Sequence, residues 1–252
     1  MFEVTLDLVM ILVAAAFVAG FVDSIAGGGG LITLPVLLLC GVSPITALAT
    51  NKVQGLFGAG MAALTYARAG QVDLRKQMRL ALLSGGSALI GAVLASSLPT
   101  DVIRLGLPFL LIAVALFFAF KPGLDDVDKK QRISPVVFAA GFVPFIGFYD
   151  GILGPGTGAF FMIGFVSLAG YGVLRATAHT KLLNFASNVG GLIGFAIVAK
   201  PLWILGLVMG AAQIAGAYLG STLATRIGAR LIKPVLVLAS TALALRLMWD
   251  WF

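Results

Sequence analysis

Apolar residues run through this chain in long uncharged stretches that short polar breaks separate. Stretches without a single Asp, Glu, Lys or Arg cover 8–22, 31–51, 80–100, 105–120, 133–149, 151–174, 182–199 and 201–225. A transmembrane helix needs about 20 predominantly apolar residues, and most of these stretches approach or exceed that length. The pattern therefore predicts an all-α, polytopic integral membrane protein.

The breaks divide the chain into two halves with five apolar segments each. In the first half the segments lie near 6–22, 31–41, 44–67, 76–97 and 101–120. In the second half they lie near 134–149, 157–170, 176–198, 202–223 and 230–251. A strongly polar cytoplasmic connector, 121–132, joins the halves. We therefore expect one integral membrane domain built from an N-terminal repeat, 1–120, and a C-terminal repeat, 133–252.

The two halves resemble each other at their most polar and glycine-rich positions. The pattern GFxDxIxGxG at 20–29 recurs at 147–156. Further along, an Ala, Ala and Lys pattern at 47, 49 and 52 recurs at 176, 178 and 181. Each copy has a glycine-rich break with one aspartate, followed by one lysine in an apolar stretch. This repetition predicts a paired site where two membrane repeats meet.

Basic residues in the loops predict the topology. The connections 68–79 and 121–132 each carry four Lys or Arg residues and are expected on the cytoplasmic side, whereas 98–100 carries none and is expected outside. The connection 199–201 corresponds to 68–79 but has only Lys200, which places it outside. The repeats are therefore expected to be inverted, with an odd number of crossings in each half and both termini outside.

Two apolar segments, 31–41 and 157–170, are too short to span a bilayer. They follow the glycine-rich breaks 27–30 and 154–158, and glycine and proline at this density interrupt a helix. Unpaired backbone at membrane depth is tolerated only where protein or a watery cavity surrounds it. We therefore expect discontinuous or re-entrant helices whose tips meet inside the protein.

The glycine breaks are candidates for an anion site. A helix that begins after such a break exposes its first N–H groups and the positive end of its dipole. Glycines also let a ligand approach this backbone closely. The alternative is that they serve only close helix packing or a bend. The candidate residues at the breaks are Gly28, Gly29, Gly30, Gly156, Thr157 and Gly158.

Lys52 and Lys181 are candidates for balancing the charge of a bound anion. A charge at the bilayer centre costs roughly 2.5–3.5 kcal/mol, so such residues face a partner or an aqueous cavity. Their neighbours supply hydroxyl, amide and imidazole groups that suit a small oxyanion. These neighbours are Thr50, Asn51, His179, Thr180 and Asn184. The alternative is that each lysine pairs with Asp23 or Asp150, or extends to the membrane interface.

Asp23 and Asp150 lie in the breaks themselves. Each is a candidate to cap the broken helix, to balance a lysine or to carry a proton during transport. His179 is the only histidine, and a structural polar contact is favoured for it over a role as a titrating group that modulates anion binding.

The composition excludes several classes of protein. Charged residues make up 11% of the chain, against roughly 25% in soluble domains, so a soluble protein is excluded. The net charge of +7 comes from short loops between spans, which topology explains without a nucleic-acid partner. One cysteine and one histidine form no metal cluster, and we expect neither a metal nor a cofactor. Because no nucleophile and base set is evident, we do not expect an enzyme.

The motifs resemble those of a known family. DSIAGGGGLITLP at 23–35, ALATNK at 47–52, GPGTG at 154–158 and ATAHTK at 176–181 are similar to the TauE/SafE sulfite exporters, also called toluenesulfonate uptake permeases. The similarity covers nearly the whole chain and is greatest to short bacterial members of the YfcA type. It implies a multi-pass protein of the bacterial inner membrane, for which the termini that the loop charges place outside would lie in the periplasm. It also implies transport of small sulfur-containing or organic anions, such as sulfite or sulfonates, coupled to a gradient of an ion such as a proton or sodium.

Residues and resemblance together lead to one expectation and two alternatives. We expect a secondary transporter with alternating access that holds a small anion near the membrane midplane between the repeats. A passive anion channel and a non-transporting membrane subunit of a larger complex are the alternatives.

Overall fold

A computed structural model of the chain describes residues 6–95, 97–99, 109, 126–228, 230, 231, 234 and 235. Every regular element in this part is helical, and no strand occurs in it. The all-α prediction is confirmed for these residues. Most of the predicted segments 101–120 and 230–251, and the start of the connector 121–132, lie outside the described residues.

Helices form at the places that the hydrophobic pattern predicts, to within a few residues at each end. The first half contains α1 (Leu6–Ala26), α2 (Gly30–Leu39), α3 (Pro44–Arg68) and α4 (Leu74–Ala95). In the second half, α6 (Pro135–Val137), the π-helical turn η1 (Phe138–Phe142) and α7 (Val143–Ile152) form one continuous helix. It is followed by α8 (Thr157–Ser167), α9 (Val173–Val198) and α10 (Trp203–Ile227).

The helices differ in whether they can cross a membrane. Five in the described part are long and apolar enough: α1, α4, Pro135–Ile152, α9 and α10. α3 is equally long, at 25 residues, but it carries buried polar side chains in its first half. α2 and α8 have only 10 and 11 residues. At about 1.5 Å per residue, each covers about half of the roughly 30 Å hydrocarbon layer. The chain is therefore a multi-pass membrane protein with two short internal helices.

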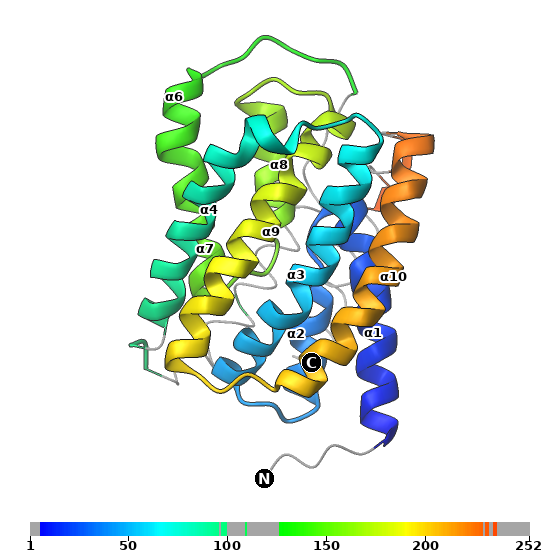
Figure 1. Cartoon of the computed structure of the whole chain (residues 1–252), viewed down its shortest axis with the longest axis vertical. Helices are drawn as coiled ribbons and strands as arrows, with labels where there is room; N and C mark the ends of the chain where they lie inside the picture. Colours follow the sequence, from blue (N-terminus) through cyan, green and yellow to red (C-terminus); the bar gives the residue numbers. More distant parts are fainter. Residues whose placement is uncertain are drawn as a thin grey trace.

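The helices stand side by side in one bundle (Figure 1). In that view the connections 69–73, 126–134 and 168–172 lie at the upper end. The start of α1 and the connections 40–43 and 199–202 lie at the lower end. α3 therefore runs upward and α9 downward, while α4 runs downward and α10 upward. α2 returns to the lower end, where α1 starts, and α8 returns to the upper end, where α6 starts.

The helix packing is preserved when the two halves are exchanged. α4 packs against α7 and α9, and in the same way α10 packs against α1 and α3, while α3 and α9 contact each other. Glycines permit this approach at matching places. A Cβ atom on Gly91 would overlap the backbone of Phe148, and one on Gly216 would overlap the backbone of Phe17. Small residues at such contacts are typical of membrane helices.

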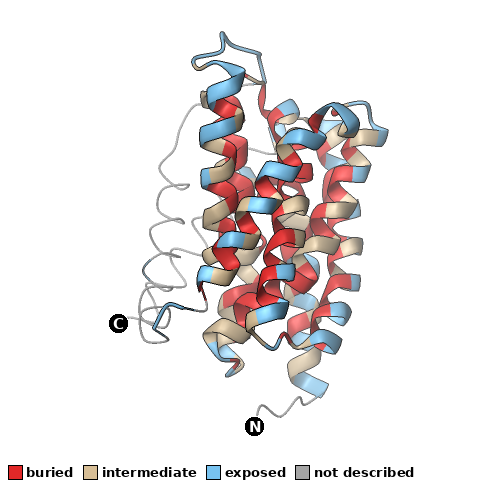
Figure 2. Cartoon of the chain, turned by 60° about the vertical axis from the view of Figure 1, so that its left-hand side comes forward, coloured by how far each residue is buried: buried red, intermediate tan, exposed pale blue. Residues whose placement is uncertain are grey.

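Buried and exposed positions separate clearly around the bundle. Buried residues line the inner faces of the helices, and exposed residues lie on the outer surface and in the connections (Figure 2). The exposed residues include large apolar side chains such as Leu82 on α4 and Ile204 on α10. A lipid-facing surface accounts for this distribution.

A π-helical turn before α7 helps to position α8. The Val143 N–H bonds to the Phe138 carbonyl, five residues back. Pro144 has no N–H for the usual bond and would clash with the carbonyl four residues before it, so the helix widens here. The Phe142 ring packs against Gly164 of α8, where a Cβ atom would overlap the ring.

Candidate functional site

The two glycine-rich breaks touch each other between the halves. Gly27 and Gly154 have φ angles of 79° and 91°, a region that residues with a Cβ atom rarely adopt. A Cβ atom on Gly27 would overlap the backbone of Gly158, and one on Gly158 would lie 3.1 Å from the Gly27 Cα. Glycine is therefore required both for the turns and for the contact between the two tips.

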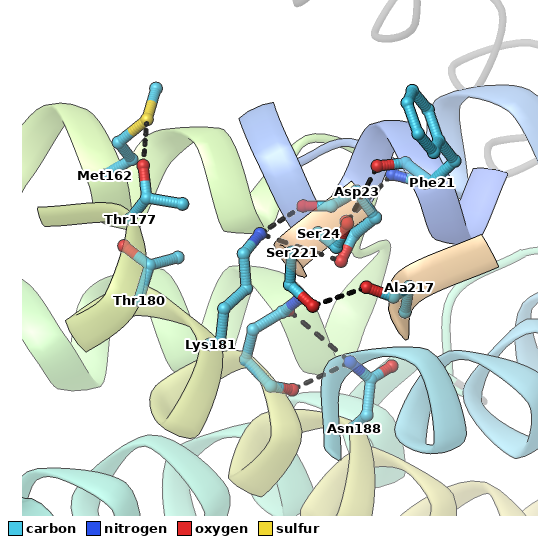
Figure 3. A network of polar contacts seen from close by, with 12 residues as sticks. Phe21, Asp23, Ser24, Met162, Thr177, Thr180, Lys181, Asn188, Ala217 and Ser221 are labelled. Atoms are coloured by element: carbon cyan, nitrogen blue, oxygen red, sulfur yellow. Dashed lines mark hydrogen bonds and ion pairs between the residues drawn. The ribbon is translucent and has the colours of Figure 1, made fainter. Parts of the chain in front are cut away.

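Each half contributes the lysine that pairs with the aspartate of the other half. Lys52 Nζ on α3 lies 2.8 Å from Asp150 Oδ1 on α7, and both side chains are buried. Lys181 Nζ on α9 lies 3.8 Å from Asp23 Oδ2 on α1 and also donates to the Asp23 carbonyl oxygen (Figure 3). Sequence alone left the pairing of the lysines open, and the structure places both ion pairs across the halves. Buried charges of this kind are tolerated only when they are paired.

The two aspartates have different surroundings. Asp23 Oδ1 accepts the Gly29 N–H at 2.9 Å, so this carboxylate caps the break before α2. Asp150 Oδ2 is buried and has no hydrogen-bond partner among the described residues. Leaving a buried acceptor unpaired costs about 1–3 kcal/mol, and more for a charged group. Asp23 therefore has a structural task, whereas one oxygen of Asp150 has no such partner among the described residues.

A cavity of about 30 Å³ lies where the two breaks meet. One ordered water needs roughly 10–15 Å³ of such space, so the cavity has room for a few waters or one small ion. We call it the central cavity. Predicted site residues form most of its wall: Asp23, Gly28, Gly29, Gly30, Asn51, Asp150, Gly156, Thr157, Gly158 and Asn184.

A chain of amides fixes the direction of Asn51 at this wall. Thr33 Oγ1 and Gln54 Nε2 both donate to Asn51 Oδ1, at 2.7 and 2.9 Å. Gln54 Oε1 in turn accepts from Gln213 Nε2 at 3.2 Å. The Asn51 amide nitrogen is thereby left to face Gly30, whose Cβ atom would lie 3.3 Å from it. Asn51 thus presents a donor to the central cavity.

Asn184 presents a second amide donor on the opposite side. Asn188 Nδ2 donates to the Asn184 carbonyl at 2.7 Å and approaches Asn184 Oδ1 at 3.4 Å. The Asn184 amide nitrogen faces Gly158, whose Cβ atom would lie 3.5 Å from it. The two predicted asparagines therefore direct N–H groups toward the two glycine breaks.

The short helices add backbone donors to the same place. α2 begins at Gly30 and α8 at Thr157. No hydrogen bond joins the N–H of Gly30 or Gly158 to another residue in the part that the structure describes. The first N–H groups of a helix carry its positive partial charge. The Thr157 hydroxyl, by contrast, is used within the break, where it donates to the Gly154 carbonyl at 2.7 Å.

Five predicted site residues lie outside the wall of the central cavity: Thr50, Lys52, His179, Thr180 and Lys181. The lysines lie behind the aspartates with which they pair. Thr50 Oγ1 accepts the Leu202 N–H at 3.0 Å, and Thr180 Oγ1 donates to the Ala176 carbonyl within α9 at 2.9 Å.

His179 lies at a different place from the other candidates. Its ring meets Tyr171 edge to face and lies tilted against Phe165, with centroid separations of 4.9 and 5.5 Å. The sequence favoured a structural polar contact for this histidine, whereas these contacts of its ring are aromatic.

Four residues of the wall were not among the candidates: Gly55, Gly154, Asn188 and Gln213. Gln213 could have been identified from the sequence, because it is the only amide or charged side chain between 201 and 225. A buried amide in an apolar span needs partners. Gly55 left no signal, since glycines are common in membrane helices for packing reasons alone.

The charges around the central cavity cancel. Asp23, Lys52, Asp150 and Lys181 form two ion pairs and sum to zero when all four are ionised. The residues that line the cavity include the amides Asn51 and Asn184, the first residues of α2 and α8, and the carboxylates Asp23 and Asp150. Amide and helix-terminal N–H groups can donate hydrogen bonds to a small anion, and a carboxylate can hold a proton.

Comparison with known proteins agrees with this architecture. The family model "Sulfite exporter TauE/SafE" matches residues 12–247. "Probable membrane transporter protein ORF9" of Sinorhizobium sp. is 55% identical over 98% of this chain and 95% of its own length. "Probable membrane transporter protein YfcA" of Escherichia coli is 41% identical over 99% of this chain and 93% of its own length. No solved structure matches the chain. The chain belongs to the TauE/SafE sulfite-exporter family.

Proposed function

We propose that this protein is a secondary transporter that carries a small anion by alternating access between two inverted repeats. One observation carries the proposal most directly. Two lysine–aspartate pairs, each joining one half to the other, surround a cavity lined by amide donors. In an alternating-access transporter the binding groups lie between the two halves. Rocking of one half against the other then opens the site to one side of the membrane at a time.

The inverted repeat is supported by the directions of corresponding helices. α3 and α9 run oppositely, as do α4 and α10 (Figure 1). α2 and α8 each return to the end from which their half starts, which fits a pair of re-entrant helices entering from opposite sides. Inverted repeats with broken helices that meet at the midplane are a recurrent transporter design.

An anion is supported by the donors at the central cavity. The amide nitrogens of Asn51 and Asn184 and the N-termini of α2 and α8 converge on it. The family name points to sulfite, and the relatives are named probable membrane transporters. The proposed substrate is therefore a small oxyanion such as sulfite, or a small sulfonate.

Proton coupling is supported by the charge balance. The four charges, three of them buried and Asp23 partly buried, cancel, so an anion alone would leave the site with an uncompensated negative charge in poorly solvated surroundings. A proton on Asp150 offsets that charge, and its unpaired oxygen has a place for the proton. Asp23 is less suited, because its carboxylate already caps α2.

The proposed orientation follows the basic residues. In the described part, Lys and Arg residues concentrate in the upper-end connections and the helix ends beside them, whereas the lower-end connection 199–202 contains one, Lys200. The upper end is then cytoplasmic. The lower end and the N-terminus lie in the periplasm of a bacterium, with the protein in its inner membrane.

Counterflow in proteoliposomes tests this function. Vesicles containing the purified protein are preloaded with unlabelled sulfite, and the initial uptake of labelled sulfite is compared with that of empty vesicles. A carrier accelerates labelled uptake under preloading, and Asn184→Ala raises the KM about tenfold through the loss of one donor to an anion. The exposed Ser43→Ala is the control. Equal uptake with and without preloading would assign a channel, and absence of uptake for sulfite, sulfate and ethanesulfonate would refute transport of small anions.

A further inference from the structure

Two long helices pack with the half of the chain to which they do not belong. α4 follows α3 in the first half but packs against α7 and α9, and α10 follows α9 but packs against α1 and α3 (Figure 1). None of the larger helix contacts in the described part joins α4 to α1, α2 or α3, or α10 to α7, α8 or α9. The described helices therefore form two bodies: the α10 body of α1, α2, α3 and α10, and the α4 body of α4, Pro135–Ile152, α8 and α9.

Hydrogen bonds and backbone contact hold the α10 body together. The buried Tyr66 hydroxyl on α3 donates to the Ser24 carbonyl on α1 at 2.9 Å. Gln213 on α10 donates to Gln54 on α3 at 3.2 Å. A Cβ atom on Gly220 of α10 would overlap the backbone of α1. Close backbone approach and polar bonds of this kind are what fasten helices to each other in a membrane.

The α4 body is held together in the same way. Ser84 Oγ on α4 donates to the Leu183 carbonyl on α9 at 3.0 Å, and Gln77 Nε2 donates to the His179 carbonyl at 2.7 Å. A Cβ atom on Gly190 of α9 would overlap the backbone of α4. Since α4 and α9 come from different halves of the chain, these contacts fasten one repeat to the other.

Contacts between the two bodies are of a different kind. Among the helix-to-helix hydrogen bonds and ion pairs of the described residues, only those of the two lysine–aspartate pairs cross from one body to the other. Where α3 faces α9, side chains fill the contact. A Cβ atom on Gly60 would lie 3.1 Å from the Phe185 ring, and one on Gly191 would lie 3.1 Å from the Lys52 stem. Helices that meet through side chains can slide against each other by shear.

The chain crosses between the bodies at two described connections. Connection 69–73 joins α3 to α4 and 199–202 joins α9 to α10, and they lie at opposite ends of the bundle (Figure 1). Gly70 has a φ angle of 73°, and no atom lies within 4 Å of a Cβ atom there, so this turn is loosely packed. The backbone is extended at Ala199, and Lys200 is exposed. A few such residues are enough to absorb the changes in φ and ψ of a hinge.

We propose that alternating access moves the α10 body against the α4 body, so that α4 and α10 each travel with helices of the other repeat. The connections 69–73 and 199–202 are the hinges, and α3 and α9 slide past each other beside the central cavity. Both lysine–aspartate pairs and the contact of the two glycine breaks lie between the bodies. The purpose of this movement rests on the proposed function, whereas the division into bodies can be measured without a transported substrate.

Distances between spin labels on the full-length protein in liposomes, measured by double electron–electron resonance, test the division. The labels are attached in pairs in a Cys40→Ser background, at four exposed positions outside the site: Met10→Cys, Leu82→Cys, Ile197→Cys and Leu219→Cys. The pairs 82/197 and 10/219 each lie within one body but in different repeats. The pairs 10/82 and 197/219 each lie within one repeat but in different bodies. Every position thus serves once in each kind of pair.

The distances are measured with and without sulfite, at acidic and at alkaline pH. We expect the two pairs between bodies to shift by more than the width of their distributions, while the two pairs within bodies keep theirs. A shift in a pair within a body would overturn the proposal, as would constant distances in all four pairs. Counterflow of sulfite on the same vesicles reports the proposed function separately. Its absence beside shifted distances between the bodies would refute sulfite transport alone.

Discussion

Lys52 Nζ lies 2.8 Å from Asp150 Oδ1, although the two residues belong to opposite halves of the chain. Lys181 and Asp23 repeat this relationship with the halves exchanged. Each of the four charges is therefore neutralised by a residue of the other repeat. If one half moves against the other, these two ion pairs must either break or change their geometry. We therefore expect them to couple the conformation of the protein to substrate binding.

Removing one member of such a pair should be more damaging than removing both. Lys52→Met leaves the Asp150 carboxylate unpaired, and breaking a buried pair in this way costs about 3–5 kcal/mol. We expect Lys52→Met to lower the melting temperature and abolish uptake. The double variant Lys52→Met/Asp150→Asn should recover most of the melting temperature but no uptake. Lys200→Met, in the lower connection, is the matched control, and an unchanged melting temperature for Lys52→Met would contradict the pairing.

The contact between the two glycine breaks should tolerate no side chain. Gly27→Ala places a Cβ atom in a positive-φ position and also into the backbone of Gly158. Gly41 has a similar φ of 84°, and no atom lies within 4 Å of a Cβ atom there. Gly41→Ala should therefore cost about 1–2 kcal/mol from backbone strain alone, and Gly27→Ala clearly more. Thermal melting in detergent compares the two variants, and equal losses would argue against close contact of the breaks.

Gln213 should act on the substrate through Asn51. Gln213→Leu removes the partner of Gln54 Oε1 and frees the amide chain that directs the Asn51 nitrogen toward the cavity. We expect a KM increase of about tenfold for sulfite, the order of one misplaced hydrogen bond. Ser221→Ala, on the same helix but bonded only within α10, should leave the KM unchanged. An unchanged KM in Gln213→Leu would show that the amide chain does not contribute to sulfite binding.

The connector should become looser at low pH because of Asp128. The Gly172 N–H and the Arg175 guanidinium hold the pKa of the Asp128 carboxyl below its usual range. Since the pKa is depressed in the folded protein, this stabilisation is present above the ordinary aspartate pKa and is lost as the pH falls through the lowered value. The backbone amides of residues 126–134 should lose protection from hydrogen exchange on acidification, once the measured rates are corrected for the intrinsic rate at each pH.

Asp128→Asn should remove this pH dependence, so that the segment exchanges rapidly already at neutral pH. Asp7→Asn, in α1 at the opposite end, serves as the control. Equal protection of the segment in wild type and Asp128→Asn would exclude the proposed contact.

The helices were predictable because each depends on local composition. Apolar runs and glycine or proline breaks determine where a helix can persist in lipid, and the observed helices follow them. The predicted end of the first segment, at 22, was too early. α1 continues to Ala26 through Asp23, because that carboxylate finds its partners in Gly29 and Lys181. Sequence shows the charge but not the partners that allow it inside a helix.

The site was predictable only in part, for a similar reason. Repetition drew attention to the glycines and aspartates, and the asparagines were candidates as polar neighbours of the two lysines in apolar spans. It did not show that the lysines pair across the halves and lie behind the cavity wall. That outcome depends on how the two halves pack. Gln213 entered the site through a contact between α3 and α10, which no local pattern encodes.

The role of Asp150 tests the account most directly, and one uptake experiment decides it. Proteoliposomes with wild-type protein or Asp150→Asn are given an inward proton gradient, and accumulation of labelled sulfite is followed beside counterflow at equal pH. We expect wild type to accumulate sulfite only with the gradient. Unlike Lys52→Met, Asp150→Asn keeps an oxygen that can accept from Lys52 and has the charge of a protonated Asp150, so it should retain counterflow. It should lose gradient-driven accumulation, because the amide cannot take up the proton. Accumulation by Asp150→Asn equal to that of wild type would contradict the proposed coupling of anion and proton at this site.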